Sequence, residues 1–135
     1  MKYLKKSEYG IKVVDNSTKE LKCGMKWYIN NLLKEELTNY EARVKTTKSV
    51  LSLKTLIPIY VRQNILLFPT TSLRSPNIIF VNYHKVMSIV SRGKTTSIIF
   101  DDLTELDLDI GYYRIKSIIN QANKLDEYIR LKLSS

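Results

Sequence analysis

Short apolar runs separated by turn-forming residues dominate the middle of this chain. They occupy residues 65–68, 78–81, 86–90 and 95–100, and proline, glycine, serine or asparagine lies between one run and the next. Short runs rich in isoleucine, valine and phenylalanine with such boundaries predict β-strands. Gly93 lies in the sequence Ser91-Arg92-Gly93-Lys94 and can adopt the positive φ of a tight turn, so we expect the last two runs to form a hairpin.

The chain before this region carries weaker patterns, which predict shorter elements. We expect strands at residues 9–14, 25–29, 50–53 and 57–61, a turn at 15–17, a helix at 32–37 and a hairpin turn at 62–64. In the strand at 25–29, alternation turns Trp27 and Ile29 towards the core. Asn30 or Asn31 is expected to cap the short helix. The polar and basic stretch 40–49 is expected to be a loop, with an edge strand as the alternative.

The periodicity changes in the last third of the chain. From Tyr112 onward, apolar residues recur at steps of three and four: Ile115, Ile118, Ile119, Ala122, Leu125, Ile129 and Leu133. This spacing places them on one face of a long α-helix. The preceding residues 103–110 alternate apolar with polar and predict a further strand or an extended lead-in. A helix with so broad an apolar face must cover something, and the strands of 57–100 are the available partner.

Together these elements predict an α+β fold, in which an antiparallel, strand-rich sheet is covered by the long C-terminal amphipathic helix. The length of 135 residues fits a single domain spanning 1–135. The single cysteine, Cys23, builds no disulfide framework, and no apolar segment typical of a secretory signal follows the basic N-terminus. No apolar run approaches the length that crosses a bilayer. We therefore expect a cytoplasmic protein without membrane association.

Charge is distributed unevenly along the chain. The formal net charge is +9, and residues 42–100 contain nine basic residues and no acidic one. These basic residues are Arg43, Lys45, Lys48, Lys54, Arg62, Arg74, Lys85, Arg92 and Lys94. Five of the acidic residues lie within 101–109 instead. Charge of one sign along strands and turns attracts a polyanion, so the sequence favours nucleic-acid binding over a basic surface kept for solubility.

Residues typical of catalysis are scarce. His84 is the only histidine, and neither it nor Cys23 lies in a motif that activates a base or a nucleophile. The acidic residues of 101–109 lack the glycine and the spacing of a calcium loop, so a solvated face is the better interpretation. The sequence contains no phosphate-binding glycine loop and no GxSxG elbow. We therefore expect no enzyme, no metal or other cofactor and no small-molecule substrate.

Basic residues in the stretch 40–49 and near turns are the candidate DNA contacts. The candidates are Arg43, Lys45 and Lys48 for phosphates, Arg74, Arg92 and Lys94 for a groove, and Lys85 in addition. An arginine on a turn can enter a narrow minor groove, whereas no helix-turn-helix pattern supports reading of the major groove. Tyrosines at 83, 112 and 113 lie near basic residues and leave stacking on single-stranded bases, and hence RNA binding, as an alternative.

Several stretches also resemble a known family. The stretch Asn64-Ile-Leu-Leu-Phe-Pro-Thr-Thr-Ser72, followed by Ser75-Pro-Asn-Ile-Ile-Phe-Val81, resembles the hallmark segment of the ComK family of bacterial competence transcription factors. Upstream, Tyr40-Glu-Ala-Arg-Val-Lys-Thr-Thr47 and Ile57-Pro58-Ile59 are similar to the family's arginine-containing segment and its later proline pair. The Gly93-Lys94-Thr95 turn and the helix from 112 to 125 follow where the family has a turn and a helix.

The resemblance implies a diverged or shortened member, because Ala42 and Thr46 stand where the family has glycines and Phe80 near where a tryptophan is common. It also implies an activator that binds AT-rich promoter boxes of double-stranded DNA, largely through the minor groove, as a homo-oligomer. A different class stays open at this point. In that alternative the chain is a non-enzymatic interaction module that pairs with a full-length regulator, or with another protein, through its helix.

Overall fold

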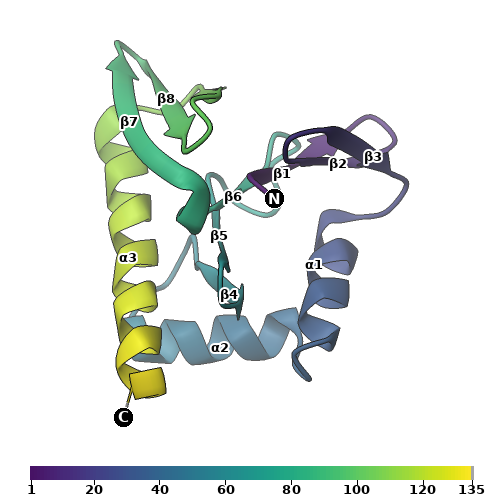
Figure 1. Cartoon of the computed structure of the whole chain (residues 1–135), viewed down its shortest axis with the longest axis vertical. Helices are drawn as coiled ribbons and strands as arrows, with labels where there is room; N and C mark the ends of the chain where they lie inside the picture. The colour runs from purple at the N-terminus through teal and green to yellow at the C-terminus, as the bar shows by residue number, and fades with distance from the viewer. Residues whose placement is uncertain (135) are drawn as a thin grey trace.

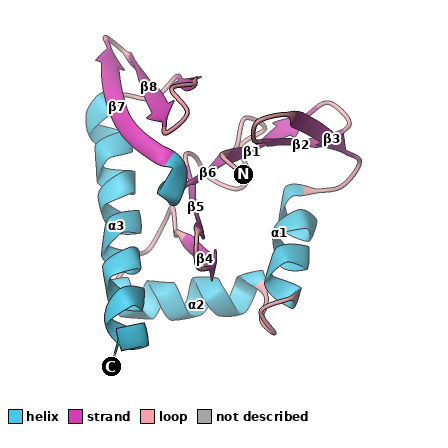
Figure 2. Cartoon of the chain, viewed as in Figure 1, coloured by secondary structure: helices cyan, strands magenta, loops and turns pink. Residues whose placement is uncertain are grey.

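The computed structural model describes residues 1–134, in which runs of short strands are separated by helices. The strands are β1 (Tyr3–Ser7), β2 (Gly10–Val14), β3 (Thr18–Leu21), β4 (Ile59–Arg62), β5 (Ile65–Pro69), β6 (Ile79–Asn82), β7 (Val86–Arg92), β8 (Thr95–Phe100) and β9 (Glu105–Leu108). The helices are α1 (Met25–Lys34), α2 (Tyr40–Leu51) and α3 (Tyr112–Ser134), and a 3-10 turn, η1 (Tyr83–Lys85), precedes β7. Figures 1 and 2 show α3 along one side, α2 across one end and the β7–β8 hairpin at the other end.

The strands form two antiparallel sheets. The larger sheet has the order β3-β2-β1-β6-β5-β4, so the N-terminal meander joins the middle of the chain through the pairing of β1 with β6. The smaller sheet has the order β7-β8-β9. Gly93 turns the β7–β8 hairpin with a φ of 80°, as its sequence predicts. The single sheet expected from the sequence is therefore two sheets, while the α+β class and the antiparallel pairing are confirmed.

An apolar core lies on each face of the larger sheet. Successive residues of β5 and β6 alternate between the cores: Leu66, Phe68, Ile79 and Val81 belong to one, Leu67 and Phe80 to the other. The first core also contains the buried face of α3 and the inner face of the smaller sheet, and the second contains the buried face of α1. Burial on both faces explains why these strands are continuous apolar runs without alternation.

The long C-terminal helix confirms the prediction made from its periodicity. Ile115, Ile118, Ala122 and Leu125 are buried against the sheets, whereas Leu133, at the far end of the same spacing, is exposed. The apolar face of α3 is therefore used within the molecule over most of its length. No helix among residues 1–134 combines the length and the apolar character needed to cross a membrane.

The prediction of a strand at 25–29 is wrong, because these residues begin α1. Met25, Ile29 and Leu33 are buried at steps of four, which is the spacing of a helical face. Trp27, expected in the core, is 62% exposed, whereas Ile29 is buried as expected. The apolar residues of 25–29 fit a strand, but those of 25–34 fit a helix. The segment adopts the structure that the longer pattern predicts.

The prediction of a capped helix at 32–37 is wrong as well. Asn30 and Asn31 lie inside α1, and the helix ends at Lys34 instead of continuing to residue 37. The Arg62 guanidinium completes this end: it donates to the Leu32 carbonyl oxygen at 3.2 Å and pairs with the Glu35 carboxylate at 2.9 Å. A cation that satisfies a terminal carbonyl is a favourable helix C-terminus.

The stretch 40–49, predicted to be a loop, forms α2, and the strand predicted at 50–53 is its end and the following turn. The Asn39 side chain accepts a hydrogen bond from the Ala42 amide at 2.8 Å and caps the helix. Ser52, in the left-handed conformation with a φ of 54°, ends it. Only Thr47 is buried in α2, so the helix lacks the apolar stripe that periodicity would detect.

Candidate nucleic-acid interface

Three of the nine basic residues of 42–100 are paired with carboxylates. The pairs are Arg62 with Glu35 at 2.9 Å, Arg92 with Glu105 at 3.1 Å, and Lys85 with Asp101 at 4.0 Å. The last two pairs form because β9 runs beside β8 and the turn before it lies beside η1. Asp101 and Glu105 belong to the acidic stretch 101–109, which thus supplies counter-charge to part of the basic stretch.

Four other basic residues gather around α2 and together form what we call the α2 basic surface: Lys45, Lys48, Lys54 and Arg74. Lys45 and Lys48 lie three residues apart on α2, and both are exposed. Lys54 follows the end of α2, and Arg74 lies in the loop between β5 and β6. Lys48, Lys54 and Arg74 line the same groove, which ties the loop to the helix. No ion pair involving these four side chains forms within residues 1–134.

The groove between α2 and the β5–β6 loop has a volume of about 340 Å³. Its walls are largely apolar, with Val44, Leu56, Pro69 and Leu73 among the lining residues. Tyr40 also lines it, and burial, followed by the nearby Glu41 charge, raises the pKa of the Tyr40 phenol. The hydroxyl is therefore neutral at physiological pH and can donate a hydrogen bond. No carboxylate lines the groove in the part of the chain that the structure describes.

The motif that resembles the ComK hallmark shapes the loop that carries Arg74. Phe68 and Pro69 are buried at the end of β5, and the buried Thr70 hydroxyl donates to the Ile79 carbonyl oxygen at 3.0 Å. The Ser72 hydroxyl then accepts from the Arg74 amide at 3.3 Å. Threonine anchors the loop to β6, and serine forms the local turn, so the motif fixes where the Arg74 side chain leaves the fold.

Arg43 lies apart from the other basic residues of α2. Its guanidinium carbon is 5.3 Å from the centroid of the Tyr60 ring, and its side chain is half-buried towards β4. The Nε atom is buried and has no hydrogen-bond partner among the described residues. Its predicted phosphate contact stays a prediction, and the position favours a role in packing α2 on the sheet through a cation–π contact.

The tip of the β7–β8 hairpin carries the remaining candidates, Arg92 and Lys94. It lies at the opposite end of the molecule from α2 along the longest axis (Figure 1). Arg92 is held by Glu105 and by the Ser97 hydroxyl at 3.4 Å, whereas Lys94 is exposed and forms no ion pair within the described chain. The structure therefore separates the predicted site residues into a group at α2 and a group at the hairpin, and Lys85 lies with neither.

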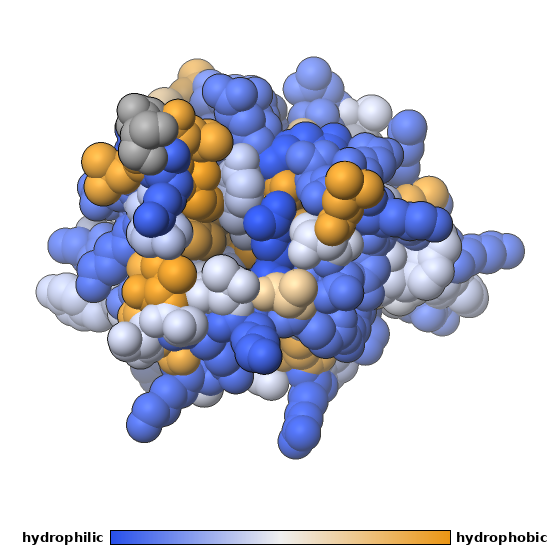
Figure 3. Space-filling view, turned by 90° about the horizontal axis from the view of Figure 1, so that it is seen from below, coloured by the Kyte–Doolittle hydropathy of each residue, from blue (hydrophilic) through white to orange (hydrophobic). Residues whose placement is uncertain are grey.

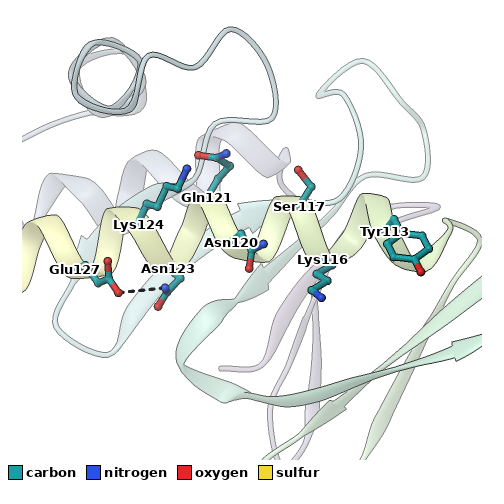
Figure 4. A pocket seen from close by; sticks show the side chains of 8 residues that line it. All are labelled: Tyr113, Lys116, Ser117, Asn120, Gln121, Asn123, Lys124 and Glu127. Carbon is teal, nitrogen blue, oxygen red and sulfur yellow. Dashed lines mark hydrogen bonds between the residues drawn. The ribbon is translucent and has the colours of Figure 1, made fainter.

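A hollow of about 430 Å³ follows the outer side of α3 and is lined by polar residues of that helix alone (Figure 4). Ser117, Gln121 and Lys124 point to one side of the helix axis, and Lys116 and Asn120 point to the other. The carboxylate of Glu127 accepts from the Asn123 amide at 3.4 Å. Side chains that diverge from one helix converge on no ligand, so this hollow is the solvated face of α3.

Figure 3 shows the molecule from the end at which α2 lies. Hydrophilic side chains cover most of this face, and apolar side chains gather beside the C-terminal end of α3. A largely hydrophilic, basic and exposed surface around an apolar groove suits a polyanion. The phosphates of such a ligand bind the basic side chains, and its less polar sugars suit the apolar groove.

Lys54 belongs to the α2 basic surface but was not among the DNA contacts predicted from the sequence. It belongs to the nine basic residues but lies in the stretch where a strand and then an undefined segment were expected. A helix prediction for 40–51 would have placed Lys45 and Lys48 on one turn and Lys54 just beyond its end. The sequence signal that could have predicted α2 is the Asn39 cap. The one buried residue of the helix, Thr47, gives no helical period.

Comparison with known proteins assigns the chain to a family. The family model described as ComK protein matches residues 2–134, which is nearly the whole chain. No curated protein sequence and no solved structure gives a significant match. The match includes the stretch 64–81, which forms β5, the loop of Arg74 and most of β6. The chain therefore belongs to the ComK family, a family of competence transcription factors without enzymatic activity.

Proposed function

We propose that this protein regulates transcription by binding double-stranded DNA through the α2 basic surface. The observation that carries the proposal is that Lys48, Lys54 and Arg74 line one groove and Lys45 lies beside them on α2. None of the four forms an ion pair with a carboxylate among residues 1–134. Unpaired cations on one face bind phosphates and release condensed counterions, which makes affinity high and salt-dependent. Arg62, Lys85 and Arg92, by contrast, are each paired with a carboxylate.

The proposal includes a preference for AT-rich DNA. AT-rich tracts have a narrow minor groove with a strong negative potential, which attracts an inserted arginine. Arg74 suits this role better than Arg92, because its loop is braced by Ser72 and its guanidinium has no carboxylate partner in the described structure, whereas Arg92 is held by Glu105. Lys94 at the hairpin tip is then a phosphate contact outside the central surface.

The interaction-module alternative receives less support. That alternative uses α3 to pair with a partner, but Ile115, Ile118, Ala122 and Leu125 of α3 are already buried in the core. We propose a cytoplasmic location and assembly as a homo-oligomer together with DNA binding, as the family suggests.

The test of DNA binding is the salt dependence of affinity for a labelled AT-rich duplex. Each phosphate contact contributes about 0.9 to the slope of log affinity against log salt, so the double variant Lys45→Ala/Lys48→Ala is expected to lower the slope by about two units and to weaken binding to all sequences. Fluorescence anisotropy at several salt concentrations measures this slope.

Lys19→Ala is the matched control, because Lys19 is an exposed lysine on β3, in a different part of the fold. It is expected to leave the slope within error of the wild type. An unchanged slope in the Lys45/Lys48 variant would remove these lysines from the site. Stronger competition by single strands than by duplex would favour RNA or single-stranded DNA instead.

A further inference from the structure

An exposed leucine lies beside the arginine of the α2 basic surface. Leu73 lines the groove together with Lys48, Lys54 and Arg74, and it is 43% exposed. Of the large apolar side chains that are exposed among residues 1–134, it is the one that lines this groove. The fold therefore leaves an apolar side chain in contact with water on the surface proposed to bind DNA.

A tight turn presents Leu73 and Arg74 together. The Ser75 amide donates to the Ser72 carbonyl oxygen at 3.0 Å, which closes a four-residue β-turn with Leu73 and Arg74 at its two central positions. The Ser72 hydroxyl accepts from the Arg74 amide at 3.3 Å, and serine is a favoured first residue of such a turn. The leucine and arginine side chains therefore leave the fold from adjacent positions of one bend.

A second turn and the end of β5 brace this bend. The Ile78 amide donates to the Ser75 carbonyl oxygen at 3.3 Å, so a further turn follows directly, and Pro76 occupies its second position, where proline is favoured. On the other side, the amide and the hydroxyl of Thr70 both donate to the Ile79 carbonyl oxygen at 3.0 Å. Because bonds on both sides hold the loop, a ligand meets a bend that is already ordered.

Leucine is an unusual residue for the centre of a turn. Turns favour glycine, proline, asparagine, aspartate and serine, which supply a special backbone conformation or a local hydrogen bond. The neighbouring positions follow this rule with Ser72, Ser75, Pro76 and Asn77, so Leu73 is the exception. A large apolar side chain in water is also unfavourable. A residue that breaks the local rule at an exposed position is expected at a functional site, where a ligand buries it.

We propose that Leu73 is a wedge that inserts between two base pairs from the minor groove and kinks the bound DNA. This inference rests on the proposed function, because it requires Arg74 to enter the same groove. Proteins that bind the minor groove insert apolar side chains, leucine among them, between base steps, and the partly unstacked duplex bends towards the major groove. The base stack then buries Leu73, while Arg74 beside it meets the negative potential of the groove.

The deformability of DNA indicates which step the wedge enters. Pyrimidine–purine steps such as TA unstack easily, whereas A-tracts are stiff. A TA step within an AT-rich duplex is therefore the expected place of insertion. A bend also lets the duplex contact more of the protein surface. Lys48 and Lys54 line the same groove as Leu73, so they are the basic residues placed to bind the phosphates that flank the kink.

Energy transfer between dyes at the two ends of an AT-rich duplex with one central TA step measures the kink, at protein concentrations that saturate the DNA. The wild type is expected to kink this duplex by an angle within the range of about 20–90° that apolar wedges produce. Leu73→Ala is expected to lose most of the kink but to keep the salt slope of the wild type, because it removes no charge. Leu73→Met keeps an apolar wedge and is expected to retain the kink.

Two further variants separate the wedge from other effects. Leu103→Ala removes a leucine that is 71% exposed between β8 and β9, and it is the matched control that should kink DNA as the wild type does. Lys45→Ala/Lys48→Ala is expected to lower the salt slope and yet to kink the duplex once it is saturated. Leu73 is exposed, so the fold of Leu73→Ala should survive, and an unchanged circular-dichroism melting curve verifies this.

A fluorescent adenine analogue at the central step gives a second measurement, because its emission rises when it unstacks. The rise is expected with the wild type and not with Leu73→Ala. A wild-type complex with the expected salt slope and a straight duplex would overturn the wedge and leave the proposed function intact. An equal kink with Leu73→Ala would also overturn the wedge. A wild type that binds no duplex would overturn the proposed function and the wedge together.

Discussion

At the scale of single residues, Asn82 joins three parts of the chain. Its buried side chain accepts hydrogen bonds from the Leu66 amide at 3.2 Å and the His84 amide at 3.3 Å. Its amide nitrogen donates to the carbonyl oxygens of Met1 at 3.0 Å and Asn64 at 3.1 Å. A buried polar group satisfied on all sides connects the N-terminal strand, the β4–β5 turn and η1.

We expect Asn82→Ala to lower the free energy of unfolding by about 3 kcal/mol, because it leaves buried backbone groups without partners. Urea denaturation followed by circular dichroism measures the change. Asn31→Ala, at an exposed position on α1, is the matched control and should change stability by no more than about 0.5 kcal/mol. An equal effect of the two substitutions would show that the Asn82 network contributes little.

The residue scale is also where sequence prediction has its clearest limit. The stretch 64–72 marks the family and a strand end, but its pattern does not say that Thr70 anchors to Ile79 or that Ser72 turns the chain under Arg74. Asn82 gave no signal at all, because a buried asparagine is recognised only from the backbone groups around it. Such contacts depend on residues brought together by the fold.

At the scale of elements, the success of each sequence-based prediction depended on how the element is buried. α3 was predictable because one face is buried and the other is solvated, which gives a clear period. β5 and β6 were predictable because both faces are buried. α2 was not, since its single buried residue gives no period and its cap was the only local signal. α1 was assigned as a strand because five residues fit both patterns.

The cap gives a prediction at this scale. Asn39→Ala is expected to destabilise the protein by about 1 kcal/mol, because the Ala42 amide loses its acceptor at the start of α2. Asn39→Ser is the control that keeps an acceptor and should lie close to the wild type. Chemical denaturation of the three proteins compares them directly. No difference between the alanine and serine variants would mean that the cap does not stabilise α2.

At the scale of the whole molecule, the basic stretch 42–100 and the acidic stretch 101–109 are separate in the sequence but only partly separate in space. The acidic stretch 101–109 lies beside β8 and η1, and its carboxylates pair with Arg92 and Lys85. Its Asp102 also reaches the buried Lys2 ammonium at 2.9 Å, and hydrogen bonds from Thr104 and Lys2 hold the pKa of this carboxyl well below its ordinary value. The sequence could not show this, because the pairing of β9 with β8 decides where the acids lie.

Among the predicted DNA contacts outside these pairs, Lys45, Lys48 and Arg74 lie at the α2 basic surface, and Lys94 lies at the opposite end of the molecule. The sequence shows which stretch is basic, and the fold decides which of its basic residues stay without a carboxylate partner. Of the seven predicted site residues, Lys45, Lys48 and Arg74 lie together, and Lys54 joins them through the groove. The proposed function depends on this group.

The most direct measurement of that claim is a titration of the wild-type protein with labelled AT-rich and GC-rich duplexes at two salt concentrations. We expect binding to both duplexes at low salt, tighter binding to the AT-rich duplex, and a marked loss of affinity for both at high salt. Absence of binding to either duplex, or binding that does not change with salt, would contradict the assignment of the α2 basic surface to DNA phosphates.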